Sequence, residues 1–323
     1  MKLIVQPAPH VHSREDKQRL MLDVILALLP ALIAGTIVYG LRALIVVLLG
    51  ALVCAVSSLI FQKVTKQQNA RLELSSVVTG MLLGMSLPAS VPYWVVLIGG
   101  IFAAVVVKGF GGGSHKCLFN PALSARALLM LLFPAALVRF AAPGAALPLF
   151  DGVDFVSSAT PLHHMQMPAL PEVSLLDAFL GNVGGCIGEA SALALLLGGI
   201  YLVLRKVITL RIPLCYLGTA AVLSLIFFKG ESPFLWMAYN LLLGGLMLGA
   251  IFMATDYATS PVTPWGQWIF GIGCGVLTVL FRYFGLYPEG VTYAILLMNV
   301  LSRTLDRITM PRRFGYGKGG ACA

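Results

Sequence analysis

Charged residues are scarce in this chain of 323 residues, where they make up 11% of the sequence against 59% for hydrophobic residues. About a quarter of the residues of an ordinary soluble domain are charged, so the composition excludes that class. The mean hydropathy is +0.91. The apolar residues come in blocks of about twenty, the length that one bilayer crossing requires. The sequence therefore predicts a polytopic membrane protein.

Clustered metal ligands are also missing. The six cysteines are scattered without a C-x-x-C pair: Cys54, Cys117, Cys186, Cys215, Cys274 and Cys322. An iron–sulfur or zinc site built by this chain alone would need clustered thiolates, and the five histidines show no metal-ligand spacing with a carboxylate. We therefore predict no metal site built by this chain alone, although a cysteine could complete one with another subunit. The chain also lacks a nucleotide-binding fingerprint.

The apolar blocks predict an all-α integral membrane fold with ten transmembrane helices. The predicted spans are 20–40, 41–62, 72–90, 92–109, 121–141, 182–204, 211–229, 234–254, 266–285 and 290–308. The corresponding segments are an N-terminal segment (1–19), a first five-helix group (20–141), a long loop (142–181), a second five-helix group (182–309) and a tail (310–323). Residues 1–19 are polar, and we expect no cleavable signal peptide.

The distribution of lysine and arginine predicts the orientation. With the N-terminus inside, seventeen of these 22 residues fall in inner segments and four in outer ones, while Arg126 falls within a span. Both termini are therefore predicted to be cytoplasmic, and the loop 142–181 to lie outside. The net charge of +9 then reflects this bias and attraction to anionic headgroups, and no basic stripe with interleaved aromatic residues indicates a nucleic-acid partner.

An internal similarity suggests how the spans are related. Gly80-Met-Leu-Leu-Gly84 and Gly245-Leu-Met-Leu-Gly249 share a pattern, and each precedes a break that contains proline and then a span that contains tryptophan. The two copies lie about five spans apart, an odd number, so the second would cross the membrane in the opposite sense. This predicts two inverted five-helix repeats with broken helices, an architecture that places binding sites near the midplane.

Three polar positions next to predicted spans are candidates for function. Asn120 precedes Pro121 in the glycine-rich segment 109–127, where it could contact a ligand or only cap a helix. Asp256 lies among hydroxyl residues where a span ends, and Glu189 lies just inside the sixth span. Acidic residues at membrane depth are functional hypotheses by default, so both are candidates for ion translocation. The alternative for Asp256 is that it caps the following helix.

Six motifs, in order along nearly the whole chain, carry a resemblance to a known family: FNPA at 119–122, D-x-x-[ST]-[GS]-A-T at 154–160, GEASALA at 188–194, RIP at 211–213, ATD with TSPVTP at 254–264, and YPEGVTYAILLMN at 287–299. The chain resembles the D subunits of the Rnf complex, the ferredoxin:NAD⁺ oxidoreductase that pumps Na⁺ or H⁺. It resembles more distantly the B subunits of the Na⁺-pumping NADH:quinone reductase.

The resemblance implies a covalent FMN on Thr160, attached through a phosphoester by a dedicated flavin transferase. Asp154, Ser157, Ser158 and Ala159 would form the recognition sequence, with Ser158 where the family more often has glycine. It also implies a non-covalent riboflavin near the inner side, for which Asn120 is the candidate contact.

By the same resemblance, we expect a multi-pass component of a bacterial cytoplasmic (inner) membrane complex. Its partners would be iron–sulfur, NAD-binding and other FMN-bearing subunits, together with the flavin transferase, the lipid bilayer, and Na⁺ or H⁺. Electrons passing between flavins would change the cation affinity of nearby acidic residues, while the cofactors supply the redox chemistry.

A second hypothesis remains open on the residues alone. Ten spans in two inverted groups with broken helices are also typical of secondary transporters and channels without a redox role. Only the segment DFVSSATPL at 154–162 separates the two, because a transporter has no need of a flavinylation signal.

The orientation can be tested with single cysteines in a background without reactive native thiols. We expect Ala145→Cys to react with a membrane-impermeant thiol reagent in intact cells and Gln68→Cys to stay unlabelled, because the positive charges put residue 68 inside. Labelling of position 68 but not of position 145 would reverse the topology.

Overall fold

The computed structural model describes residues 17–66, 71–111, 117–144, 147–149, 157–158, 162, 173–229, 232–285 and 289–310. The elements of the N-terminal half are α1 (Lys17–Tyr39), α2 (Leu41–Val64), α3 (Leu74–Met85), α4 (Tyr93–Ile101), the π-helix η1 (Phe102–Phe110), α5 (Pro121–Leu132), α6 (Pro134–Leu137) and β1 (Phe140–Ala141). Those that follow are β2 (Ser157–Ser158), α8 (Leu175–Leu180), the 3₁₀-helix η2 (Ile187–Glu189), α9 (Ala192–Leu204), α10 (Arg211–Ile226), α11 (Pro233–Leu242), α12 (Leu246–Leu248), the π-helix η3 (Gly249–Met253), α13 (Pro264–Phe284) and α14 (Val291–Thr309).

The described chain is mostly helical, as the apolar blocks predicted, and each of the ten predicted ranges contains a helix. Within the described ranges, four stretches are long and apolar enough to cross a bilayer, namely α1, α2, α4 with η1, and α13. A fifth is α11 with α12 and η3, if these two arms, bent by 62°, count as one span. The structure thus supports a membrane protein with four or five clear spans. Ten spans in inverted repeats remain a prediction.

Helix length explains why α3, α5, α9 and α10 fall short, whereas α14 has 19 residues and falls short because it carries three charged residues. Helices α3 and α5 have 12 residues each, and α9 has 13. At 1.5 Å per residue, such helices are about 18–20 Å long, whereas the hydrocarbon core is about 30 Å thick. The missing length is provided by extended or bent segments next to each helix, which the apolar pattern does not distinguish from helix.

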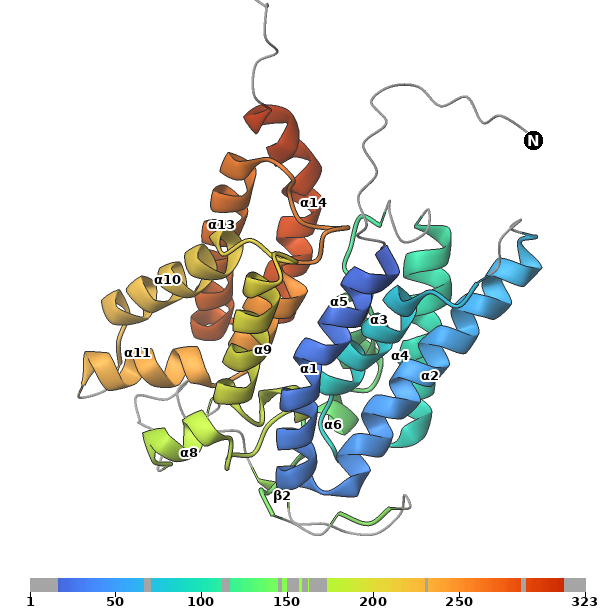
Figure 1. Ribbon diagram of the computed structural model, residues 1–323. Helices are drawn as coiled ribbons and strands as arrows, with labels where there is room; N and C mark the ends of the chain where they lie inside the picture. Colours follow the sequence, from blue (N-terminus) through green and yellow to red (C-terminus); the bar gives the residue numbers. More distant parts are fainter. Residues whose placement is uncertain are drawn as a thin grey trace, which may run out of the picture.

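The helices form two groups that meet along α1 and α9. Helices α1 to α5 lie on one side in Figure 1 and α10 to α14 on the other, with α1 packed against α9 between them. Asp23 of α1 accepts hydrogen bonds from Tyr201 (2.9 Å) and Arg205 (3.2 Å) of α9. Gly198 of α9 lies against the backbone of α1 at Ala27. The two halves are therefore joined by close helix packing and by a polar contact at one end.

Two non-helical segments meet where the short helices end. Residues 86–92 follow α3 and residues 181–186 precede η2, and they meet in an isolated antiparallel bridge between Pro88 and Cys186. The amide of Ile187 donates to the carbonyl of Leu87 at 3.1 Å, and the Tyr39 hydroxyl donates to the carbonyl of Val183 at 2.8 Å. Backbone groups that lack helical partners are thereby satisfied within the protein, as an apolar solvent requires.

Two buried arginines bind the backbone where other helices are interrupted. Arg42 donates to the carbonyls of Ala89 (3.0 Å) and Val91 (3.2 Å), after the end of α3. Arg282 of α13 donates to the carbonyls of Asn240 and Leu243 at the end of α11. The side chains replace the donors that the next helical turn would have supplied.

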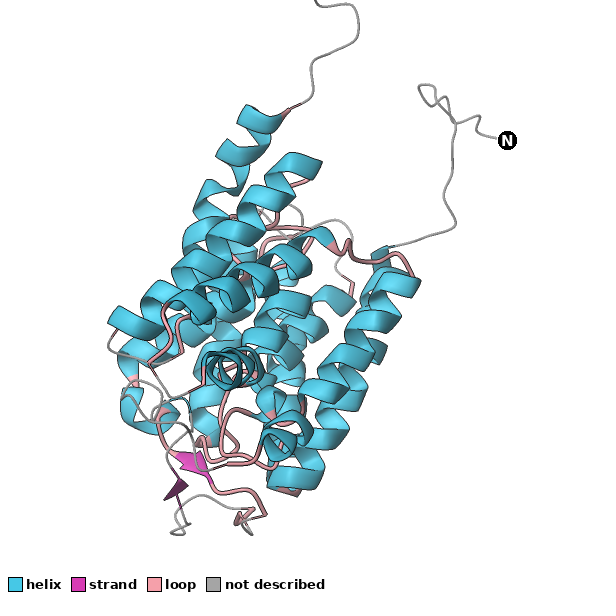
Figure 2. Ribbon diagram, turned by 90° about the vertical axis from the view of Figure 1, so that its left-hand side faces the viewer, coloured by secondary structure: helices cyan, strands magenta, loops and turns pink. Residues whose placement is uncertain are grey.

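The first described helix begins, and the last one ends, at the end of the molecule opposite to the short strands. The start of α1 and the end of α14 both lie at the upper end of Figure 1, whereas β2 lies at the lower end, and Figure 2 shows both strands at that lower end. Strand β2 pairs antiparallel with β1, with Phe140 opposite Ser158 and Ala141 opposite Ser157. This arrangement agrees with the start of α1 and the end of α14 on one side of the membrane and strand β2 of the loop 142–181 on the other.

The contact between α2 and α3 depends on glycine. A Cβ atom at Gly80 would collide with the backbone of Gly50 and Ala51, whereas one at Gly218 of α10 would meet nothing within 4 Å. We expect Gly80→Ala to destabilise the protein by about 1–3 kcal/mol through overpacking. Gly218→Ala should have no effect or stabilise by up to about 1 kcal/mol. The measurement is the unfolding midpoint of the purified protein in detergent, and equal midpoints for the two variants would contradict the tight contact.

Candidate functional site

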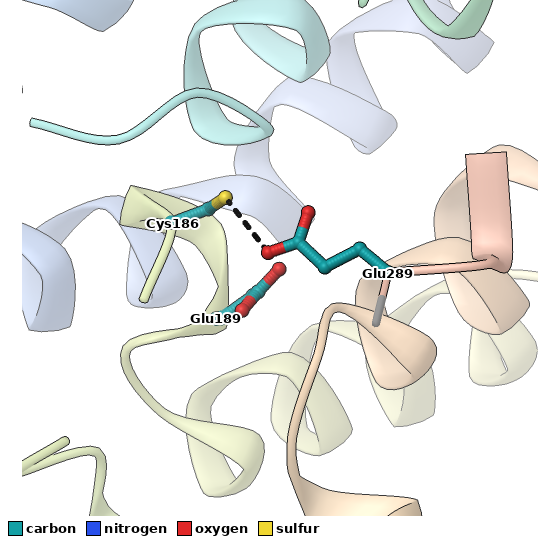
Figure 3. Close-up of side chains that lie close together, drawn as sticks. All are labelled: Cys186, Glu189 and Glu289. Atoms are coloured by element: carbon teal, nitrogen blue, oxygen red, sulfur yellow. Dashed lines mark hydrogen bonds between the residues drawn. The ribbon is translucent and has the colours of Figure 1, made fainter. Parts of the chain in front are cut away.

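A cluster of charged and thiol side chains lies where the interrupted segments meet. Cys186 and Glu189 come from the segment around η2, Glu289 precedes α14, and Arg126 lies in α5. Figure 3 shows Cys186 and the two glutamates turned toward one another, and their ligand atoms all lie within 4.8 Å of each other. We call these four residues the charge cluster. Residues far apart in the sequence thus form one polar site inside an apolar protein.

One ion pair dominates the charge cluster. The Arg126 guanidinium contacts the Glu289 carboxylate, and their side chains are 12% and 11% exposed. Cys186 Sγ accepts from Arg126 at 3.4 Å and lies 3.9 Å from Glu289 Oε1. Removing one partner of such a buried pair costs about 3–5 kcal/mol because it leaves an uncompensated charge. Arg126 therefore compensates the charge of Glu289 within the protein.

Glu189 has no comparable partner for one of its oxygens. Its Oε1 atom is buried and has no hydrogen-bond partner among the described residues. It lies against the break between α11 and α12, where Gly244 and Gly245 have φ values of 75° and 65°. A Cβ atom at Gly245 would come within 2.7 Å of that oxygen. Glycine is thus required at this position both for its backbone conformation and for space beside the carboxylate.

A second polar site surrounds a cavity of about 130 Å³, which we call the inner cavity. Its polar lining residues are Ser75, Thr79, Lys108, Cys117, Asn120, Thr255, Asp256 and Tyr257, and its apolar walls include Leu20, Met21, Val24, Leu202, Ile208 and Phe252. The structure thus brings together two of the residues predicted from the sequence, Asn120 and Asp256. Glu189 is not among the lining residues and belongs to the charge cluster.

Asn120 is the N-cap of α5 and also reaches across to the other half of the chain. Its Oδ1 accepts from the amides of Ala122 (3.0 Å) and Leu123 (3.4 Å), and its Nδ2 donates to the carbonyl of Met253 at 3.1 Å. The capping alternative is therefore observed. An amide nitrogen carries two N–H groups, and the second, which meets no acceptor among the described residues, can donate to a ligand.

Asp256 lies in the connection between η3 and α13, and its Oδ1 accepts from the amide of Ala258 at 3.3 Å. The alternative that it only caps the following helix is wrong. The N-cap of α13 is Thr263, whose hydroxyl accepts from the amide of Gly266 at 3.3 Å. Burial raises the pKa of the Asp256 carboxyl above its ordinary value. Asp256 is thus an acid beside a cavity, with a local turn as its structural role.

Lys108 provides a positive charge at the inner cavity. It lies in the π-helix η1, a deviation that is frequent at functional sites, and is 5% exposed. Its ammonium group donates to the hydroxyls of Ser75 and Ser76, each at 2.7 Å, and pairs with Glu73 at 3.3 Å. These partners offset the cost of burying the charge.

The predicted flavinylation motif is mostly outside the described residues, namely Asp154, Ala159 and Thr160. Ser157 and Ser158 form β2. The sequence analysis did not single out Lys108 or Glu289 and left Arg126 without a role. All three are charged residues inside or beside predicted spans, and that signal could have identified them.

Comparison with known proteins assigns the family. The family model described as "NQR2, RnfD, RnfE family" matches residues 4–315. The chain belongs to this family. Among its relatives, the D subunit of the Na(+)-translocating ferredoxin:NAD(+) oxidoreductase complex of Acetobacterium woodii is 42% identical over 98% of this chain and 97% of its own length.

Two further members of the NQR2, RnfD, RnfE family show the range of its names. The D subunit of the proton-translocating ferredoxin:NAD(+) oxidoreductase complex of Clostridium ljungdahlii is 38% identical over 96% of both chains. The D subunit of the ion-translocating oxidoreductase complex of Stutzerimonas stutzeri is 35% identical over 95% of this chain and 94% of its own. The resemblance predicted from the six motifs is therefore confirmed.

Proposed function

We propose that the chain is the D-type membrane subunit of an ion-translocating ferredoxin:NAD⁺ oxidoreductase complex of a bacterial inner membrane. The observation that carries this proposal is the full-length similarity to subunits with that name, at 42% and 38% identity. Since the chain has neither clustered thiolates nor a nucleotide-binding fingerprint, partner subunits must supply the iron–sulfur, NAD-binding and further FMN sites. A transporter without a redox role is disfavoured because the flavinylation motif is retained.

In this proposal FMN is attached to Thr160 by a flavin transferase. The threonine hydroxyl attacks the flavin-side phosphorus of a dinucleotide flavin donor. The phosphoester forms at that oxygen, the pyrophosphate bond breaks, and the nucleoside monophosphate and the hydroxyl proton are released. The small residues Ser157, Ser158 and Ala159 leave room for the transferase, and Asp154 contributes to recognition. The position of β2, at the end opposite to the described chain ends (Figure 1), supports an FMN outside the membrane.

We assign the non-covalent riboflavin to the inner cavity, which at about 130 Å³ must widen to admit it, because pockets for such ligands are typically about 300–1,000 Å³. Apolar walls suit a flat aromatic ring system, and the remaining N–H of Asn120 can donate to a ring carbonyl or nitrogen. FMN and riboflavin would supply the one-electron chemistry when they are bound. The residues of this chain hold the rings and exclude water, Lys108 places an ammonium group beside the cavity, and Asp256 provides a carboxyl that can take up a cation.

The acidic residues Asp256 and Glu189 would respond to that chemistry. An electron that arrives beside the inner cavity adds a negative charge in a medium of low dielectric constant, where charges interact more strongly than in water. Asp256 borders that cavity, and Glu189 belongs to the charge cluster. Cation uptake at these carboxylates would compensate the added charge, which couples electron transfer to movement of Na⁺ or H⁺.

The covalent flavin is tested by flavin fluorescence of the denatured protein on a gel. We expect Thr160→Ala to abolish the signal, because no other atom takes the place of the Thr160 hydroxyl in the phosphoester. Ser158→Gly, the matched control, should keep the signal, and Asp154→Ala should reduce it. Riboflavin released on denaturation should be unchanged in all three variants. A fluorescent Thr160→Ala protein would refute the attachment site.

The coupling role of Asp256 is tested by ion transport in proteoliposomes driven by oxidation of ferredoxin. We expect Asp256→Asn to keep both flavins and to reduce transport by about tenfold or more, corresponding to a loss of about 1.4 kcal/mol. Asp256→Glu, which keeps the charge, should retain most of the transport. Normal transport in the Asp256→Asn variant would reduce Asp256 to a turn residue.

A further inference from the structure

A small cavity lies beside the charge cluster. Its volume is about 20 Å³, and its lining includes both Glu189 and Glu289 together with Gly184, Gly185 and Gly244. A cavity by this measure needs about 10–15 Å³ to hold one water molecule. The space therefore suits one water or one small ion that has lost most of its water shell.

The carboxylate beside this cavity lacks a partner. Glu189 Oε1 is buried without a hydrogen bond from the described residues. Buried polar groups are almost always satisfied, and an exception indicates a missing water, proton or ion. Glu189 and Glu289 therefore converge on a small cavity with an oxygen that can serve as a ligand.

The distances suit a cation between the two carboxylates. An oxygen of Glu189 and one of Glu289 lie within 4.8 Å of each other. Ca²⁺, whose radius is about that of Na⁺, holds oxygen ligands at about 2.3–2.6 Å, so an ion of this size can contact both. Carboxylate oxygens are hard ligands that suit such ions, while a soft metal would require the Cys186 thiolate. That sulfur is already in contact with Arg126 and Glu289.

The charged side chains around the small cavity explain how such an ion could bind and be released. Arg126 offsets the charge of Glu289, and Arg282, which holds the carbonyls of Leu243 and Gly244 beside the cavity, is a second positive charge nearby. Two arginines thus face two glutamates, and one more cation would leave the site with an excess positive charge. If Arg126 separates from Glu289 when the ion enters, the Glu289 carboxylate becomes free to bind that ion.

We propose that Glu189 and Glu289 form a binding site for a small monovalent cation, and that Arg126 is a tethered counter-ion which the cation displaces from Glu289. The proposal rests on the proposed function in ion translocation and identifies the residues that bind the ion. In the described structure Arg126 forms an ion pair with Glu289. Loading with the cation breaks this ion pair, and unloading restores it.

Equilibrium binding of ²²Na⁺ to the purified intact complex, without redox substrates, tests the site. We expect Glu189→Gln to remove one bound Na⁺ per complex, because the change leaves the Arg126–Glu289 pair intact and should not disturb folding. Asp177→Asn in α8, a matched change of a carboxylate outside the cluster, should bind as the unmodified complex does. Unchanged stoichiometry in Glu189→Gln would overturn the site.

The role of Arg126 is tested by the sign of the change in affinity. Arg126→Gln removes the competing charge and should tighten Na⁺ binding about tenfold or more, whereas a purely structural arginine would leave binding unchanged or weaken it. Arg126→Lys keeps the charge and should stay near the unmodified affinity, which gives a second measurement if Arg126→Gln does not fold. A tenfold change in affinity with Arg126→Lys would overturn the counter-ion role.

A soft-metal site gives a different pattern. Competition of ²²Na⁺ by Cd²⁺ that disappears in Cys186→Ser would mean that the cluster is a thiolate metal site, and it would overturn the proposal. Failure of the proposed function is a separate result. It would show as loss of ferredoxin-driven transport or absence of covalent flavin, neither of which enters a binding measurement made without redox substrates.

Discussion

Backbone groups inside a bilayer have no water to bind, and this constraint determines where the chain can leave the helical conformation. The described structure meets it at these interruptions with donors from the protein itself. Arg42 binds the carbonyls after α3, and Arg282 binds the carbonyls at the end of α11. The bridge between Pro88 and Cys186 joins two further non-helical segments. Without these contacts the breaks would be too costly in an apolar solvent, and the helices would run through.

The breaks in turn allow charged groups to meet. Residues 181–186 are not helical, and this interruption places Cys186 and the short 3₁₀-helix η2, which carries Glu189, beside Glu289 (Figure 3). The α11–α12 break presents Gly245 to Glu189, and the absence of a side chain there leaves room for the carboxylate. The same irregular backbone therefore accounts for the short helices and for the buried acids.

Particular elements show what could be predicted. The apolar blocks were sufficient to locate a helix in every predicted span, because composition alone decides what enters a bilayer. The proline after Asn120 was sufficient to predict a helix cap, which is observed. The pattern could not predict which spans are short, since an extended apolar segment has the same composition as a helical one. Nor could it pair Arg126 with Glu289, because 163 positions separate them and only the tertiary fold brings them into contact.

The inner cavity and the charge cluster are close enough to affect each other, because α5 contributes to both. Asn120 caps this helix at the cavity, and Arg126 lies six residues further on, a rise of about 9 Å. On the opposing segment, Met253 contacts Asn120 and Gly245 contacts Glu189. Two unit charges about 9 Å apart interact by about 2 kcal/mol at an effective dielectric constant of about 20. A negative charge placed beside Asn120 would therefore stabilise, by about this amount, any state of the charge cluster that carries one more positive charge. Such a free energy corresponds to more than a tenfold increase in the affinity of the cluster for a cation. Salt screens such buried charges little, so direct electrostatic interaction along α5 is sufficient for coupling, without a large movement of the helices.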